Sequence, residues 1–221
     1  MSIFIIAEAG VNHDGDFDSA QYLIECAKNA GADAVKFQLF RDRPEIEHLR
    51  MTEDQIAILA DTAAHFEIEF MCTPFYVDAV KFLDPLVKRH KIASGWTKDR
   101  AIFNAAVGTG KQVIASLGMY EGQPPQKPSS MVDYLHCVSR YPCPDKYANL
   151  NNICMYSSII GYSDHTVGTV ACVAAAALGA QIIEKHITYN TEAKGPDHSC
   201  SAVTADFYQM VQDIRRVEVM L

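Results

Sequence analysis

Short apolar runs that end in polar residues recur along this chain, and this repetition limits the folds open to it more than any other feature. The run Ile3–Ala7 is apolar throughout, as in a parallel strand covered on both faces, and the polar segment after it begins at Glu8. Ser19–Asn29 then places apolar residues at helical spacing. Strand, polar loop and helix in this order predict a βα unit.

The same unit repeats to the end of the chain. Strands are predicted at Ile3–Ala7, Ala32–Gln38, Glu69–Thr73, Lys91–Ser94, Gln112–Ser116, Met131–Cys137, Ile159–Ser163 and Ala180–Ile187. Helices are predicted at Ser19–Asn29, Thr52–His65, Asp78–Leu86, Asp99–Val107, Val167–Leu178 and Thr204–Leu221. Thr52 and Gln55 fit a capping box at a helix start. We therefore expect an α/β protein, a compact (β/α)8 TIM barrel in which residues 1–221 form a single domain.

One connection departs from the repeat. Glu121–Ser130 contains three prolines where the fifth helix of a barrel would lie, and proline interrupts helices. We expect the fifth helix to be missing or irregular, and we interpret the segment as a surface loop rather than a binding segment.

Charge and cysteine content narrow the classes of partner and compartment. The net charge is −8 and no basic stripe is present, which disfavours nucleic-acid binding. The N-terminal apolar run is interrupted by Glu8, and Ala171–Ala180 is too short to cross a bilayer, so we expect no membrane segment. The seven scattered cysteines form no CxxC pair, a pattern typical of a reduced, cytoplasmic protein.

Three lysines, Lys36, Lys91 and Lys185, lie in or at the end of apolar strands. A buried ammonium group is costly without a partner, so the lysines indicate either a bound anion or pairing with a carboxylate such as Glu184 or Glu8. Hydroxyl side chains occur in or after other strands, at Thr73, Ser94, Ser116 and Ser139. Convergence of these groups at one face of a barrel favours a phosphate or carboxylate site.

Two histidines follow adjacent strands, His165 in GYSDHT and His186 in EKHIT. Their imidazoles would supply two ligands to a divalent metal ion and leave coordination positions open for water and substrate. A structural role for each histidine stays equally open, because no HxxxH motif or cysteine cluster supports the pair. Other histidines could be additional or rival ligands: His13, His136 and His198.

Carboxylates accompany these positions. Glu8 ends the first strand, while Asp164 and Asp197 flank the proposed metal loops. Each could act as a general acid or base, bind a sugar hydroxyl group, or orient a histidine. The residues alone thus predict a metal-assisted enzyme for a small anionic substrate and leave the reaction type open.

The order of the motifs AEAGVNHDGD, GADAVKFQ, CTPF, KIASG, LHCVSRYP, IGYSDHT, ALGA, IEKHIT and GPDHS resembles the sialic acid synthase family. The resemblance spans nearly the whole chain. Members of that family condense phosphoenolpyruvate with an N-acetylated amino sugar on a (β/α)8 barrel that holds a divalent manganese or magnesium ion. The resemblance implies an enzyme with the same partners, in which the metal polarises an open-chain aldehyde, the enol carbon attacks it, and water adds before phosphate leaves.

The resemblance also implies residue roles. The metal would be held by His165 and His186. Phosphoenolpyruvate would be bound by Lys36, Thr73, Lys91, Ser94, Ser116 and Ser163, to which we add Ser139. The sugar side would comprise Glu8, Asp197 and Trp96. Catalysis would depend on Glu8, Lys91 and Asp197.

Several positions depart from the family pattern. Trp96 stands where a glutamate is usual, Ser139 replaces an asparagine, and Leu39–Met51 is a shortened second loop. The sequence stops at Leu221, where family members continue into an antifreeze-like domain that reaches the sugar in a partner subunit. We expect altered acceptor selectivity, with Trp96 either stacking on a sugar or packing. A homodimer remains possible through contacts between barrels.

Three functions remain under consideration. The leading one is a synthase that forms a nonulosonic, sialic acid-like 2-keto acid. The second is a phosphoenolpyruvate-dependent synthase for another aldose. The third is a non-catalytic remnant that binds phosphoenolpyruvate or metal together with a partner chain.

Overall fold

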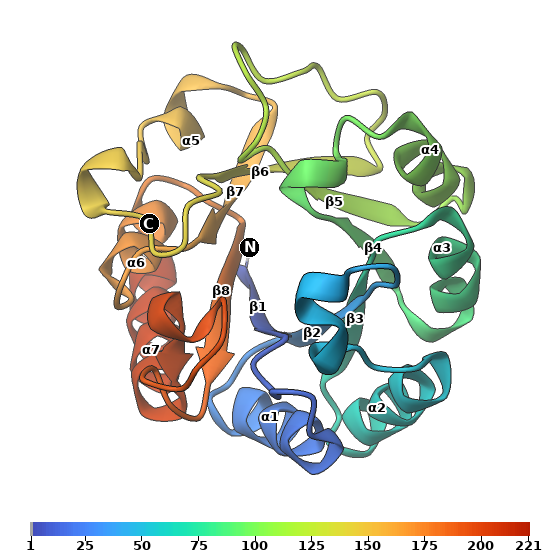
Figure 1. Ribbon diagram of the computed structural model, residues 1–221. Coiled ribbons are helices and arrows are strands. Elements are labelled where there is room, and N and C mark those ends of the chain that lie inside the picture. Colours follow the sequence, from blue (N-terminus) through green and yellow to red (C-terminus); the bar gives the residue numbers. More distant parts are fainter. Residues whose placement is uncertain (1) are drawn as a thin grey trace.

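The computed structural model describes residues 2–221, and eight parallel strands in it enclose a barrel (Figure 1). The strands are β1 (Phe4–Gly10), β2 (Ala34–Leu39), β3 (Glu69–Pro74), β4 (Arg89–Ile92), β5 (Gln112–Ser116), β6 (Val132–Cys137), β7 (Ile159–Asp164) and β8 (Ile182–Thr188). They pair in the order β3-β2-β1-β8-β7-β6-β5-β4. The two ends of this order, β3 and β4, lie against each other. The predicted (β/α)8 TIM barrel is confirmed.

Helices surround the barrel on the outside (Figure 1). They are α1 (Phe17–Asn29), α2 (Glu53–His65), α3 (Val77–Leu83), α4 (Arg100–Gly108), α5 (Asn152–Met155), α6 (Val170–Ala177) and α7 (Thr204–Met220). The capping box at the start of α2 is present: Thr52 Oγ1 accepts from the Gln55 backbone, and the Gln55 side chain accepts from the Thr52 backbone. Helix α6 begins three residues later than predicted, because Gly168 has a φ of +76°.

The connections differ most from a regular barrel. Glu121–Ser130 contains no helix, as predicted, whereas the short α5 between β6 and β7 was not predicted. A 3₁₀ turn at Pro44–Leu49, in the second connection, lies in front of the barrel in Figure 1. Its Leu49 packs with Val11 and Phe40 in a small apolar cluster. A two-residue strand, β9 (Ala202–Val203), pairs with β8.

The barrel interior is arranged in layers, because successive side chains of a strand point to opposite faces. One layer is apolar and consists of Ile6, Ala34, Met71, Ile114, Leu135 and Ile182. A larger apolar cluster fills the space between the strands and the helices. Two residues further along the same six strands come Glu8, Lys36, Thr73, Ser116, Cys137 and Glu184. Alternation places this second set on the inner face, above the apolar layer and toward the C-terminal ends of the strands, where active sites of such barrels form.

Residues 2–221 include no helix that is both long and apolar enough to cross a membrane.

A substitution at Gly161 would test how closely the barrel wall is packed. A Cβ atom at this residue of β7 would lie 2.4 Å from the carbonyl oxygen of Ile182 and 2.7 Å from a methyl group of Leu135. We expect Gly161→Ala to lower the free energy of unfolding by about 1–3 kcal/mol, because overpacking forces backbone shifts. Urea unfolding would measure the change.

Gly108→Ala is the matched control. Gly108 ends α4, and no atom lies within 4 Å of its added Cβ. For this variant we expect the free energy of unfolding to rise by about 0.5–1 kcal/mol, since alanine is a better helix former than glycine. Equal midpoints for the two variants would contradict the close packing at Gly161.

Candidate active site

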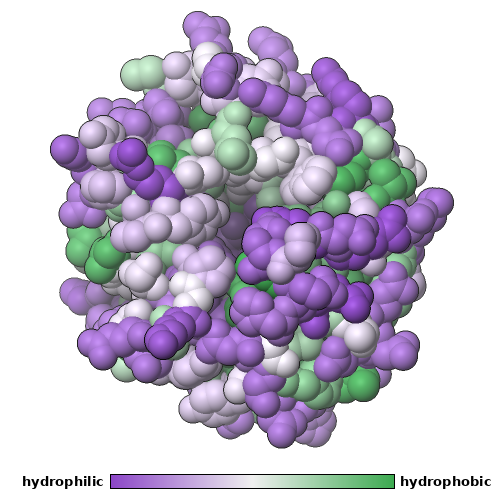
Figure 2. Space-filling view, in the orientation of Figure 1, coloured by the Kyte–Doolittle hydropathy of each residue, from purple (hydrophilic) through white to green (hydrophobic). Residues whose placement is uncertain are grey.

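A polar cavity lies at the C-terminal ends of the barrel strands. Its volume is about 50 Å³. Of the residues predicted to form the site, Glu8, Lys36, Thr73, Lys91, Ser94, Ser116, Ser163, His165 and His186 line it. A hollow is visible near the centre of this face in Figure 2. The structure thus brings together side chains from all eight strands and from loops that follow them.

Larger cavities lie elsewhere on the molecule, but fewer ionisable and hydrogen-bonding side chains line them. One of about 420 Å³ lies between the segment around Pro124 and the segment after α5. Its only charged lining residue, Lys127, is paired with Asp133 at 2.7 Å. The barrel-mouth cavity instead concentrates ammonium, carboxylate, hydroxyl and imidazole groups, so we assign the candidate active site to it.

Lys36 lies among acceptors at one side of the cavity. Its Nζ is 2.7 Å from Glu8 Oε2, 3.5 Å from Glu184 Oε2 and 3.2 Å from Thr73 Oγ1. Burial disfavours the charged amine, but the carboxylates of Glu184 and Glu8 outweigh burial and raise the pKa of Lys36. Lys36 therefore stays protonated without a ligand.

Lys91 shares one of these carboxylates. Its Nζ donates to Ser116 Oγ at 2.8 Å and lies 3.5 Å from Glu184 Oε1, which also accepts from Ser163 Oγ at 2.8 Å. Burial lowers the pKa of Lys91. Burial also opposes ionisation of Glu184, but the charges of Lys36 and Lys91 outweigh it and lower the pKa of Glu184 to about 2. The pairing of lysines with Glu8 and Glu184, considered as an alternative to an anion site, is present together with the hydroxyl groups that favour that site.

Two carboxylates approach each other across Gly10. Its φ is +55°, and a Cβ there would lie 3.3 Å from Glu8 Oε1 and 3.4 Å from Asp197 Oδ2. Burial, which outweighs the charge of Lys36, raises the pKa of Glu8 to about 7, and burial also raises the pKa of Asp197. A carboxyl group with a pKa near neutrality can both accept and donate a proton.

The two histidines lie side by side, with ring centroids 5.5 Å apart. His165 Nδ1 donates to the Val138 carbonyl at 2.9 Å, which leaves its Nε2 available as a ligand atom. His186 Nδ1 is buried without a hydrogen-bond partner, 3.9 Å from Asp197 Oδ2. Within residues 2–221 no group of three or more His, Cys, Asp or Glu side chains is arranged around a metal position. A metal ion held by this pair would therefore need its remaining ligands from water and substrate.

Lys185 is a correction to the sequence analysis. It does not reach the mouth with the other two lysines, because it lies between the inward-pointing Glu184 and His186 and therefore points outward. Its Nζ lies 2.7 Å from Asp164 Oδ2, and both side chains are fully buried. Asp164 also accepts from the Thr166 backbone and from the Tyr162 hydroxyl. This ion pair supports the segment that carries His165.

The three histidines considered as additional or rival ligands make hydrogen bonds outside the cavity. His198 contacts Asp14 Oδ1 through Nε2 at 2.9 Å and Thr188 Oγ1 through Nδ1 at 2.7 Å. His136 Nε2 bonds the Ala148 carbonyl at 2.7 Å, and His13 Nδ1 accepts from the Gly15 backbone at 3.1 Å. These contacts fix loops rather than face the other site residues.

Three predicted residues lie at the margin of the site. Ser139 Oγ and Ser94 Oγ both lie beside the backbone of Gly118, within 3 Å of the position that a Cβ atom would take there. Trp96 packs edge-to-face on Phe75, with ring centroids 6.0 Å apart, and only Phe75 of the two lines the cavity. Asp197 approaches from its loop over Gly10, as described above.

Sequence reasoning missed several lining residues: Gln38, Phe75, Cys137 and Tyr141, and it treated Glu184 only as a partner for lysine. Once the structure shows that Leu135 and Ile182 point inward, the period of two along β6 and β8 also puts Cys137 and Glu184 on the inner face. Tyr141, whose ring centroid lies 4.0 Å from that of His165, gave no such signal because it lies in a loop.

The chain resembles known proteins over most or all of its length. The NeuB family matches residues 44–221. The chain is 39% identical over 241 residues to an uncharacterized protein of Methanocaldococcus jannaschii, covering 99% of this chain and 72% of that protein. It is 35% identical over 262 residues to the N,N'-diacetyllegionaminic acid synthase of Legionella pneumophila, covering 100% and 74% of the two chains.

Solved structures give the same result. The crystal structure of an N-acetylneuraminic acid synthetase from Leptospira borgpetersenii, in complex with citrate, has a TM-score of 0.89 and 31% identity and covers 100% of this chain and 85% of its own. A truncated 3-deoxy-D-arabino-heptulosonate 7-phosphate synthase from Thermotoga maritima has a TM-score of 0.73 at 12% identity, covers 99% and 87% of the two chains, and shares the fold alone.

The buried pair formed by Lys185 and Asp164 generates a stability prediction. We expect Lys185→Met to cost about 3–5 kcal/mol, because it leaves the Asp164 charge buried and uncompensated. Lys81→Met is the control, since Lys81 pairs with Asp78 at 3.1 Å on the surface, where both side chains are mostly exposed; its cost should stay below about 1 kcal/mol. Denaturant unfolding of both variants would measure the difference, and similar costs would refute the structural role of Lys185.

Proposed function

Because the chain belongs to the NeuB family, we propose that it condenses phosphoenolpyruvate with an N-acetylated amino-sugar aldehyde and releases phosphate and a nonulosonic 2-keto acid. The observation that carries this proposal is the polar layer above the apolar barrel interior, in which two ammonium groups, several hydroxyl groups and two imidazoles face one cavity. Relatives named as legionaminic acid and N-acetylneuraminic acid synthases support the substrate class.

The anionic end of phosphoenolpyruvate fits the lysine side of the cavity. Lys36 and Lys91 provide ammonium donors from neighbouring positions around Glu184. Ser116 and Ser163 already donate or accept within this network and can turn toward phosphate or carboxylate oxygens. Thr73 and Ser94 complete the proposed set of hydroxyl groups. Burial strengthens each of these charge-assisted contacts relative to the same contact in water.

A divalent manganese or magnesium ion held by His165 and His186 would polarise the aldehyde oxygen of the acceptor when bound. The chain's own contribution is orientation. Val138 fixes the His165 ring through Nδ1, and the unpartnered Nδ1 of His186 is available toward the cavity side that holds Asp197.

The proposed reaction forms one carbon–carbon bond and consumes one water. The methylene carbon of phosphoenolpyruvate bonds to the aldehyde carbon, water adds to C2, and phosphate leaves with its bridging oxygen so that C2 becomes the ketone. Glu8, whose pKa is raised to about 7 by burial, can accept the proton of that water. Asp197, which approaches Gly10 from the same side as Glu8, would contact a hydroxyl group of the sugar.

The proposal also includes a cellular location and an acceptor preference. A cytoplasmic location is supported by the seven cysteines, all of which are free. Trp96, which packs on Phe75 rather than presenting a carboxylate, supports an acceptor preference different from that of relatives with glutamate at this position.

The test is phosphate release from phosphoenolpyruvate with manganese present, followed by mass spectrometry of the products. N-acetylmannosamine, its 6-deoxy diacetamido relatives and an aldose without an acetamido group would form the acceptor panel. We expect acceptor-dependent phosphate release and a keto-acid adduct with an acetamido sugar. An adduct with the plain aldose alone would correct the substrate class, and no release with any acceptor would overturn the proposed activity.

Substitution at the lysine side gives a second measurement. Lys91→Met should lower the rate of phosphate release by at least about 100-fold, because it removes a preorganised cation from the reacting anion. Lys88→Met, at an exposed lysine three residues earlier in the chain, should leave the rate unchanged. Equal rates for the two variants would exclude the barrel-mouth cavity as the site of reaction.

A further inference from the structure

A second cavity lies on the outer flank of the barrel, beside the connection that lacks a helix. Its volume is about 210 Å³, and its walls include Thr97, Lys98, Arg100, Phe103, Tyr120 and Tyr134. None of its lining residues lines the barrel-mouth cavity. A helix with its side chains is about 10–12 Å across, so the extended, proline-containing segment after Tyr120 leaves space beside β6 that a helix would fill.

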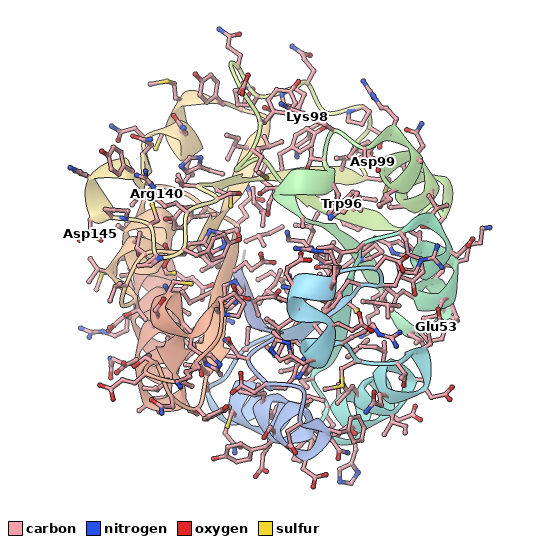
Figure 3. The ribbon with its side chains drawn as sticks, in the orientation of Figure 1. Glu53, Trp96, Lys98, Asp99, Arg140 and Asp145 are labelled. Carbon is pink, nitrogen blue, oxygen red and sulfur yellow. The ribbon has the colours of Figure 1, made fainter. Side chains whose placement is uncertain are left out.

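The charge on this cavity is positive although the chain as a whole carries −8. Lys98 and Arg100 have no carboxylate partner within 4.0 Å among residues 2–221. Asp99 lies between them in the chain, but its carboxylate caps α4 by accepting from the Ala101 backbone at 2.9 Å. Figure 3 shows Lys98 and Asp99 in the segment that joins β4 to α4. Both cations thus line the cavity, and no Asp or Glu is among its lining residues.

Tyr134 contributes a hydroxyl group to the same cavity. The residue as a whole is only 3% exposed, and its hydroxyl group makes no hydrogen bond to another group within residues 2–221. Burial raises the pKa of Tyr134, and the nearby Tyr120 adds to this effect, so the group is a protonated donor. A hydroxyl group that lines the cavity and has no acceptor in the protein is free to donate to a ligand oxygen.

We propose that this flank cavity is a binding site for a small oxyanion of the phosphate class. Lys98 and Arg100 would neutralise the charge, and the hydroxyl groups of Tyr134 and Tyr120 would donate hydrogen bonds to its oxygens. Tetrahedral oxyanions accept several donors at once, which matches two cations and two hydroxyl groups around one hollow.

The flank cavity is connected to the active site through one short segment. Thr97, in its wall, donates from Oγ1 to the Ser116 carbonyl at 2.6 Å. The 3₁₀ turn just before it carries Ser94, which lines the barrel mouth, and Trp96. Trp96 is the one tryptophan of the chain and lies two residues from Lys98. We expect its fluorescence to change when an anion binds at Lys98.

Inorganic phosphate is the probe, titrated into the Lys91→Met variant so that the barrel mouth lacks one of its cations. Trp96 fluorescence and titration calorimetry would follow binding. We expect saturable binding. Adding Lys98→Gln and Arg100→Gln together should weaken it at least about tenfold, since each substitution removes a charge-assisted hydrogen bond. Tyr134→Phe should weaken binding by a smaller factor.

The control carries Lys88→Gln and Arg216→Gln, which remove the same formal charge from exposed positions outside the cavity. It should bind phosphate as the parent does. No detectable heat or fluorescence change in the parent, or the same weakening in control and cavity variants, would overturn the proposal. Because no turnover is measured, this outcome is independent of whether the chain is a synthase.

Discussion

The site depends on Glu184, a buried carboxylate at the centre of the barrel mouth. Two ammonium groups, those of Lys36 and Lys91, lie within 3.5 Å of it. Placing two like charges in a water-poor interior is unfavourable unless an opposite charge lies between them. Glu184 supplies that charge and also accepts from Ser163. Lys36 consequently stays charged when no substrate is bound, both lysines stay oriented around Glu184, and an incoming anion meets donors already in place.

Local patterns in the sequence were sufficient to predict the barrel, since apolar strand runs and helical spacing are properties of neighbouring residues. They also located most of the lining residues, because polar groups at strand ends share one face. Lys185 was misplaced because the prediction considered position at the strand end but not the phase of alternation, which Ile182 on the inner face fixes for β8. The contacts that decide this phase join different strands, so a single strand does not reveal them.

The loops were less predictable for a related reason. The prolines of Glu121–Ser130 correctly predicted the loss of a helix. They carried no information on the space left beside β6, which depends on how Tyr120 and Tyr134 pack across two segments. Tyr141 likewise reaches the active site through a loop path that only long-range contacts determine.

The alternation along β7 and β8 also restricts how this protein can change in length. Ser163 and Glu184 face the site, whereas their neighbours Asp164 and Lys185 form an ion pair on the outer side. Deleting or inserting a single residue in either strand would exchange the two sets. The polar site residues would then lie in the layer between strands and helices, and residues of that layer would line the cavity. Insertions and deletions are therefore tolerable only in the connections, such as the one at Glu121–Ser130, and the strands must change by substitution alone.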